Sequence, residues 1–126
     1  MNPLTHEWVS KAEEDFAAAE RLLCVRNTPL YAIVCFHCQQ CAEKYLKAVL
    51  QEHKQSIPKI HHLIELLTLI SQVEPTCQFL RSDLEILEDY AVDFRYPGIV
   101  ATKDDAKSAY KAAKTIRAFI RQRLGL

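Results

Sequence analysis

The chain has 126 residues, of which 49% are hydrophobic and 25% are charged, as in globular proteins and unlike disordered ones. Sixteen basic residues balance sixteen acidic ones, and only two glycines occur. This composition argues against a protein that coats nucleic acid, an all-β fold rich in tight turns, and a glycine-rich phosphate loop. The length predicts a single domain over residues 1–126.

The N-terminal residues lack the apolar core of a signal peptide, and no apolar run approaches the roughly 20 residues that a membrane span needs. We therefore expect a cytoplasmic protein without membrane contact. Its five cysteines are an odd number, which favours reduced thiols over a disulfide framework.

Five prolines punctuate the chain, and apolar residues recur between them at helical spacing. The first predicted helix runs from about Thr5 to Val25. The second runs from about Leu30 to Glu52, with Thr28 as its N-cap and Pro29 in its first turn. Because the second helix is apolar on more than one side, we expect it to lie at the centre of the fold.

A shorter helix is predicted over His61–Ser71, and a fourth helix over Cys77 to about Phe94. The fifth is capped by Thr102 and runs to about Leu124. Amphipathic helices joined by short connections predict an all-α fold, an antiparallel up-and-down four-helix bundle with an additional short helix.

Cys35, Cys38 and Cys41 have the local spacing of an iron–sulfur run. Such clusters are held by irregular loops, whereas thiols three residues apart on a helix follow a drifting line that cannot enclose a metal. We interpret these residues as small side chains for helix packing, and we expect no metal and no cofactor.

His61 and His62 stand where the third predicted helix begins. The positive end of a helix dipole disfavours a protonated imidazole, which leaves a neutral ring to form hydrogen bonds or act as a base. The alternative interpretation is a capping or surface pair of histidines.

Arg95 precedes a rigid Tyr96-Pro97 unit, and its planar guanidinium suits a phosphate or a carboxylate. The alternative is a structural arginine that pairs with Glu43 or Asp93. Glu43 lies near the apolar side of the second helix, where a buried carboxylate needs a partner, and Arg95 is a candidate for that role.

The last helix carries a basic stripe, which we interpret as a solvated face in preference to a nucleic-acid surface. Tyr110 lies within it and either stacks on a base or packs against the core. The stripe consists of Lys103, Lys107, Lys111, Lys114, Arg117, Arg121 and Arg123.

The ordered set of these features resembles the HEPN domain family over essentially the whole chain. The resemblance implies a helical bundle that forms a homodimer, binds an ATP-like nucleotide and has a minimal nucleotidyltransferase as its partner, as in a toxin–antitoxin pair. The matching residues are Trp8, Ala12 and Asp15, the run Gln39–Ala48, His61 with Leu63, and Arg95-Tyr96-Pro97.

One branch of the family cleaves RNA with an Arg followed after four to six residues by a His. Here Val100, Ala101 and Thr102 occupy the positions of that His, and His62 is the last histidine of the chain. His62 also stands where relatives often have Asp or Asn.

We therefore expect a binding module rather than an enzyme, and RNA is not the favoured ligand. The alternatives are an RNase toxin with a non-standard active site and a purely structural interaction module. The dimer face is predicted either around Cys35, Cys38 and Ala42 or on the exposed side of the fourth helix. The candidate residues for binding a nucleotide or partner are His61, Arg95, Glu43, Lys47 and Tyr96.

Overall fold

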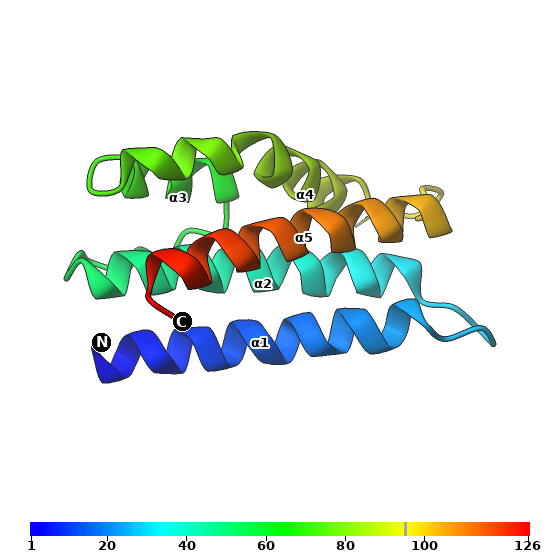
Figure 1. Cartoon of the computed structure of the whole chain (residues 1–126). Helices are drawn as coiled ribbons and strands as arrows, with labels where there is room; N and C mark the ends of the chain where they lie inside the picture. Colours follow the sequence, from blue (N-terminus) through cyan, green and yellow to red (C-terminus); the bar gives the residue numbers. More distant parts are fainter. Residues whose placement is uncertain (95) are drawn as a thin grey trace.

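The computed structural model describes residues 1–94 and 96–126, and within these ranges it is helical and contains no strand (Figure 1). The all-α bundle with an additional short helix is therefore confirmed. Its elements are α1 (Pro3–Leu23), α2 (Tyr31–Glu52), α3 (Leu63–Ile70), the 3₁₀ helix η1 (Pro75–Leu80), α4 (Arg81–Asp93) and α5 (Lys103–Arg123).

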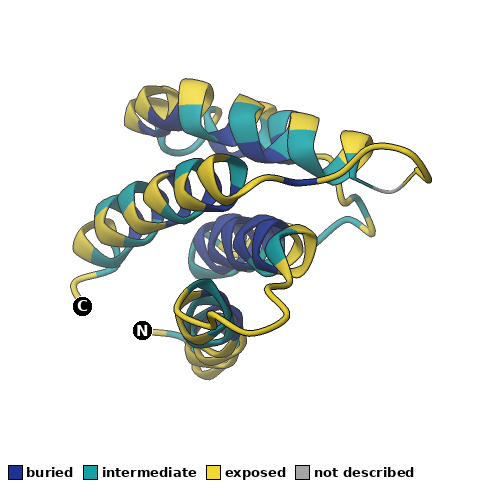
Figure 2. Cartoon of the chain, turned by 90° about the vertical axis from the view of Figure 1, so that its right-hand side faces the viewer, coloured by how far each residue is buried: buried dark blue, intermediate teal, exposed yellow. Residues whose placement is uncertain are grey.

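Helix α2 lies at the centre of the bundle, as its apolar pattern predicts, and packs against α1, α3, α4 and α5. Figure 1 shows α1 antiparallel to α2 and α4 antiparallel to α5. Buried residues gather where the helices face one another, and exposed residues cover the outer faces (Figure 2). None of the helices in the described part of the chain is long and apolar enough to cross a membrane.

The ends of two helices differ from the sequence prediction. Helix α1 begins at Pro3 rather than Thr5, because the side chain of Asn2 accepts a hydrogen bond from the backbone N–H of Leu4. The predicted cap of α2 at Thr28 is wrong. Thr28 has a φ of 53°, which places it in the left-handed region, and α2 begins at Tyr31 without a side-chain cap. The residues around Thr28 therefore belong to the connection between the helices.

The predicted cap of α5 is confirmed, because Thr102 and Asp105 form a reciprocal capping box. The predicted fourth helix, by contrast, is divided into η1 and α4, which meet at Arg81. Helix α3 begins at Leu63, so His61 precedes the helix and His62 is its N-cap residue.

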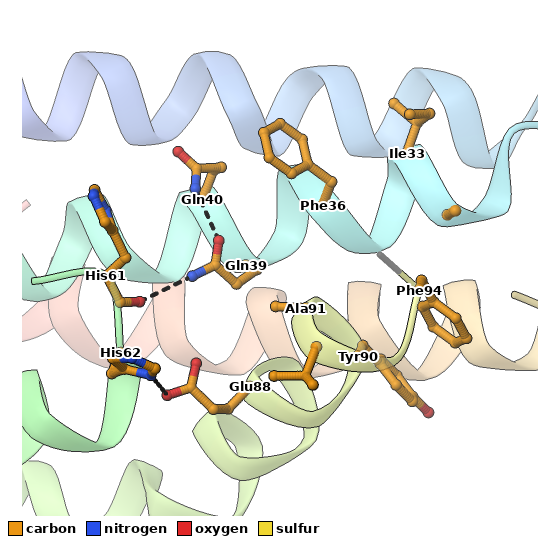
Figure 3. A pocket seen from close by; sticks show the side chains of 12 residues that line it. Ile33, Phe36, Gln39, Gln40, His61, His62, Glu88, Tyr90, Ala91 and Phe94 are labelled. Atoms are coloured by element: carbon orange, nitrogen blue, oxygen red, sulfur yellow. Dashed lines mark hydrogen bonds and ion pairs between the residues drawn. The ribbon is translucent and has the colours of Figure 1, made fainter. Parts of the chain in front are cut away.

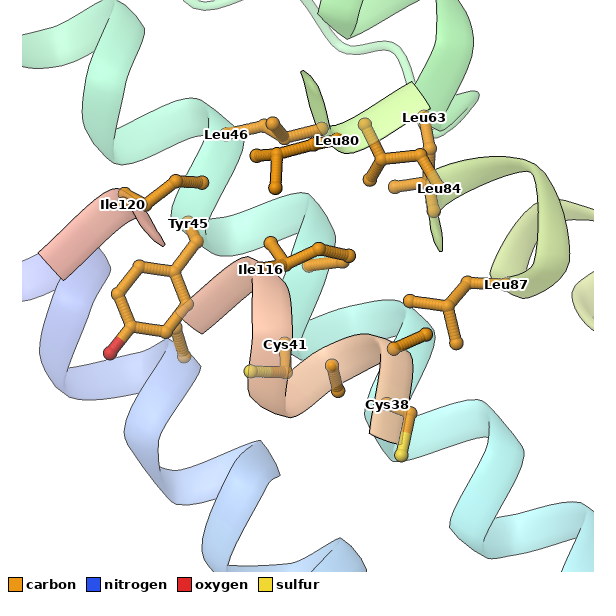
Figure 4. Close-up of a cluster of buried hydrophobic side chains, with 14 of the residues drawn as sticks. Cys38, Cys41, Tyr45, Leu46, Leu63, Leu80, Leu84, Leu87, Ile116 and Ile120 are labelled. Carbon is orange, nitrogen blue, oxygen red and sulfur yellow. The ribbon is translucent and has the colours of Figure 1, made fainter. Parts of the chain in front are cut away.

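The core is a cluster of aliphatic side chains that surrounds α2 (Figure 4). Cys35, Cys38 and Cys41 belong to it and are buried, in agreement with their interpretation as packing residues. Burial raises the pKa of the Cys35 and Cys38 thiols to about 12, so both stay protonated near neutral pH. Cys35, Cys38 and Ala42 are themselves enclosed within the chain, so a dimer face on this part of α2 would be formed by the exposed residues beside them.

The basic stripe of α5 is divided between two environments. Lys103, Lys107, Lys111 and Lys114 are exposed, as expected for a solvated face. Tyr110 instead donates a hydrogen bond to Glu20 over 2.6 Å and stacks on Phe16 with ring centroids 5.3 Å apart. This packing occupies the ring that was a candidate for stacking on a base.

Glu13 of α1 fastens the C-terminal half of α5 to the bundle. Arg117 donates two hydrogen bonds of 2.7 Å to its carboxylate, and Arg121 donates a third of 3.2 Å. The buried Tyr45 of α2 donates a fourth, of 2.8 Å. The hydrogen bonds from Arg117 are the largest cause that lowers the pKa of Glu13 below its ordinary value.

This depressed pKa predicts a loss of stability in acid. The folded state binds fewer protons at Glu13 than the unfolded state, so the contribution of Glu13 is complete above its unfolded pKa and is lost as pH falls through its folded pKa. We expect Glu13→Gln to reduce the decline of the free energy of unfolding between about pH 6 and pH 3, measured by urea denaturation. The neighbouring, exposed Glu14 is the control. An equal decline in Glu13→Gln and Glu14→Gln would contradict this role.

Candidate functional site

A groove of about 590 Å³ opens between the N-terminal half of α2 and the C-terminal end of α4 (Figure 3). This volume lies within the range of about 300–1,000 Å³ that is common for small-molecule sites. The groove is lined by Ala32, Ile33, Phe36, Gln39, Gln40, His61, His62, Glu88, Tyr90, Ala91, Val92 and Phe94.

The walls of the groove are largely apolar and partly aromatic. Phe36 and Ile33 of α2 are 53% and 42% exposed, although the helical period of the sequence places both among the apolar positions of α2. Phe94, which packs against Tyr90 with ring centroids 5.3 Å apart, lines the opposite side. Aromatic rings that line a groove present flat surfaces to a ligand or a partner.

The polar end of the groove is ordered by a chain of hydrogen bonds. The amide of Gln40 donates to the side-chain oxygen of Gln39 over 2.9 Å, and Gln39 donates to the backbone carbonyl of His61 over 3.3 Å (Figure 3). Gln39 is buried, so it ties the segment before α3 to the middle of α2. Gln40 also lines the groove, which adds a second amide to its polar end.

His61 is held by a buried ion pair beneath it. Its Nδ1 lies 3.2 Å from one carboxylate oxygen of Glu43, and the Nζ of Lys47 lies 3.2 Å from the other. Glu43 and Lys47 are 4% and 5% exposed, whereas the side chain of His61 is 76% exposed. The imidazole is therefore the part of this triad that a ligand can reach.

His62 has a similar arrangement with a different helix. Its Nδ1 lies 3.5 Å from the carboxylate of Glu88 in α4, and the same carboxylate accepts a 2.9 Å hydrogen bond from the backbone N–H of Leu63. Glu88 thereby caps α3 and orients the ring of His62. The side chain of His62 is also largely exposed.

Both carboxylates face Nδ1 of their histidine, at hydrogen-bond distance for His61 and at an ion-pair distance of 3.5 Å for His62. A carboxylate only accepts hydrogen bonds, so a neutral imidazole beside it carries its proton on Nδ1 and leaves Nε2 as an acceptor. A protonated ring instead offers Nε2–H as a donor. The groove thus joins an apolar aromatic wall to a polar end whose donors change with protonation.

The structure brings together three of the five candidate residues, namely His61, Glu43 and Lys47. Among the described residues the partners of Glu43 are Lys47 and His61. Lys47 is too deeply buried for direct ligand contact. Tyr96 is 62% exposed in the turn after α4 and is not among the lining residues of the groove. Arg95, and with it the predicted pair of Arg95 and Glu43, lies outside the described residues.

Sequence reasoning missed Glu88, Gln40 and Phe36 as groove residues. For Glu88 no local signal exists, because its contact with the start of α3 joins residues 25 positions apart. For Phe36 the helical period was misleading, since an apolar residue on a central helix is expected in the core.

Comparison with known proteins agrees with the resemblance read from the sequence. The family model of the HEPN domain matches residues 5–123. The crystal structure of TT1696 from Thermus thermophilus has the same fold, with a TM-score of 0.79 over 94% of this chain and 96% of that chain at 23% identity. No curated protein matches the chain in sequence. Because the family model spans nearly the whole chain, this protein belongs to the HEPN domain family.

Proposed function

We propose that this HEPN protein is a binding module that holds a nucleotide in the groove between α2 and α4. The observation that carries the proposal is the combination of an aromatic wall at Phe36 and Phe94 with a polar end at His61 and His62. Any nucleotide base can stack on an accessible aromatic ring, whichever base it is. Amide and imidazole groups form hydrogen bonds with sugar and phosphate oxygens. The ligand class is an ATP-like nucleotide.

The first test is calorimetric titration of the purified protein with ATP. We expect saturable binding that Phe36→Ala weakens by roughly 5- to 150-fold, because stacking of one base on an aromatic ring is worth about 1–3 kcal/mol. Phe79→Ala is the matched control, since Phe79 is 67% exposed on η1 and does not line the groove. Equal affinity of the Phe36 and Phe79 variants would contradict the proposed position of the base.

Arg95→Ala tests the phosphate contact that the sequence predicts for Arg95. Weaker binding of ATP in a variant that melts like the wild type would assign the guanidinium to the ligand. Unchanged binding would leave His61 and His62 as the groups that meet the phosphates.

We further propose that the protein works as a homodimer whose interface includes the rims of this groove. Exposed apolar side chains stand on both sides of it, and clustered exposed apolar residues are typical of protein interfaces. They are Ile33 and Phe36 on α2 and Val92 on α4. The Phe36→Ala protein is therefore also studied by sedimentation velocity, which separates a lost dimer from a lost stacking contact.

A minimal nucleotidyltransferase is the proposed physiological partner, and family membership is what supports it. If the wild-type protein binds no ATP, the groove is better explained as a surface for protein recognition. A pull-down from its own cell extract would then show whether such a transferase is retained.

A further inference from the structure

The groove carries few charges for a site proposed to meet phosphate. Among its described lining residues, those that can carry a charge near neutral pH are His61, His62 and Glu88, and these residues include neither lysine nor arginine. The Tyr90 hydroxyl is a further titratable group, on α4. Any positive charge that these lining residues offer to an anion therefore has to come from the two imidazoles.

Lys47 of α2 lies beneath this end of the groove, and its ammonium group is already paired with a carboxylate. Its Nζ pairs with Glu43 over 3.2 Å and lies over the ring of Trp8, 5.7 Å from the centroid. It is 5% exposed, so its charge serves to neutralise Glu43 instead of contacting a ligand. The carboxylate of Glu88, by contrast, has no lysine or arginine among its described partners.

Among the described residues, the charge of the polar end therefore depends on the two histidines. Lys47 cancels Glu43, so with both imidazoles neutral the unbalanced charge of Glu88 leaves one net negative charge, which repels a phosphate. With both imidazoles protonated the same groups carry one net positive charge, which attracts it. The net charge of these described groups therefore changes sign when two protons are taken up.

We propose that the groove binds phosphate-bearing ligands together with protons, which are taken up on His61 and His62. This inference rests on the proposed nucleotide site and adds how that site recognises an anion. On binding, each ring takes up a proton from solvent on Nε2 and donates this N–H to a phosphate oxygen. Meanwhile Nδ1 of His61 keeps its hydrogen bond to Glu43, and Nδ1 of His62 keeps its ion-pair contact with Glu88. No covalent bond forms or breaks other than these N–H bonds.

The two carboxylates determine which nitrogen of each imidazole is available to the ligand. Each is anchored independently of its histidine, Glu43 by Lys47 and Glu88 by the backbone N–H of Leu63, so each carboxylate stays in place whether or not its ring is charged. They hold Nδ1 and leave Nε2 as the nitrogen that can turn to the ligand. Affinity for phosphate is therefore high when the rings are protonated and falls as pH rises through the range in which histidine titrates.

The test compares the pH dependence of ATP binding in the wild type and in His61→Gln/His62→Gln by calorimetry. Above the midpoint of histidine titration, linkage lowers affinity about tenfold per pH unit for each proton taken up. For each pH unit, we expect the wild-type affinity to fall by an additional factor of about 10 to 100 compared with the affinity of the double variant. The titration of ATP itself cancels in this comparison. His53→Gln is the matched control, because His53 pairs with Glu74 and does not line the groove.

A second measurement applies if the double variant binds too weakly to titrate. The imidazole resonances of His61 and His62 are followed by NMR in the wild type, with the single variants used for assignment. Saturating ATP is expected to move the midpoints of both titrations to higher pH, and unmoved midpoints would overturn the inference.

The two proposals fail in different ways. ATP binding with the same pH dependence in wild type and double variant would overturn proton coupling while leaving the nucleotide site in place. Absence of ATP binding by the wild type at every pH between about 5 and 8 would overturn the nucleotide site itself.

Discussion

Replacing Glu43 with alanine is expected to lower the free energy of unfolding by about 3–5 kcal/mol, because Lys47 would remain as a buried charge without its partner. Both side chains are almost fully enclosed, and Trp8 covers the ammonium group from the side of α1. The exposed His61 cannot replace the carboxylate, since it offers no negative charge. Urea unfolding of the wild type and Glu43→Ala near neutral pH measures the loss.

Two further variants make this prediction specific. Glu85→Ala removes a glutamate of an exposed pair with Arg81, and it should change the free energy of unfolding by less than about 1 kcal/mol. The double variant Glu43→Leu/Lys47→Met removes both buried charges and should recover most of the loss. A loss below about 1 kcal/mol in Glu43→Ala would mean that Lys47 reaches solvent by extending its flexible side chain.

The stability of these variants also limits what Glu43 can reveal about the groove. A partly unfolded Glu43 variant would lose its ligand because the groove itself is no longer folded. For this reason the functional tests use Phe36, His61 and His62, which are exposed to solvent and whose replacement leaves the core intact.

Leu46→Ala is expected to cost about 2–5 kcal/mol of unfolding free energy, the second large effect. Leu46 is fully buried on α2 and belongs to the cluster of aliphatic side chains drawn in Figure 4, so its truncation leaves a cavity at the centre of the bundle. Because α2 contacts the four other α-helices, little of that cavity can close by the movement of one neighbour.

Leu4→Ala is the matched control for this prediction, since it makes the same chemical change on α1 at a side chain that is 50% exposed. We expect it to alter the free energy of unfolding by at most about 0.5 kcal/mol. Comparable losses in the two leucine variants, measured by urea denaturation, would show that the region around Leu46 is not the core of the fold.

The sequence predicted the helices better than it predicted their ends. Apolar residues at helical spacing locate the long helices, because burial of one face stabilises a helix over many residues at once. An end depends on a few hydrogen bonds, so a single backbone angle can move it. Thr102 is a cap because Asp105 completes the box, whereas Thr28 has a suitable side chain but adopts a left-handed conformation.

The candidate site shows the same division between local pattern and tertiary contact. The sequence singled out His61 and placed Glu43 near the apolar side of α2, since both inferences use only positions along one helix or at its start. It did not predict that Lys47 and His61 meet Glu43, nor that Glu88 holds His62 and caps α3.

By itself, the sequence determined the helical class of this protein, its central helix, the burial of Cys35, Cys38 and Cys41, and its family. Hydrophobic periodicity and the order of motifs can be read directly from the order of residues along the chain. The tertiary structure decided which apolar side chains remain exposed around the groove and which carboxylate faces each histidine. Those contacts depend on how α2, α3 and α4 pack, and that packing balances the burial of every helix face at once, so no local segment specifies it.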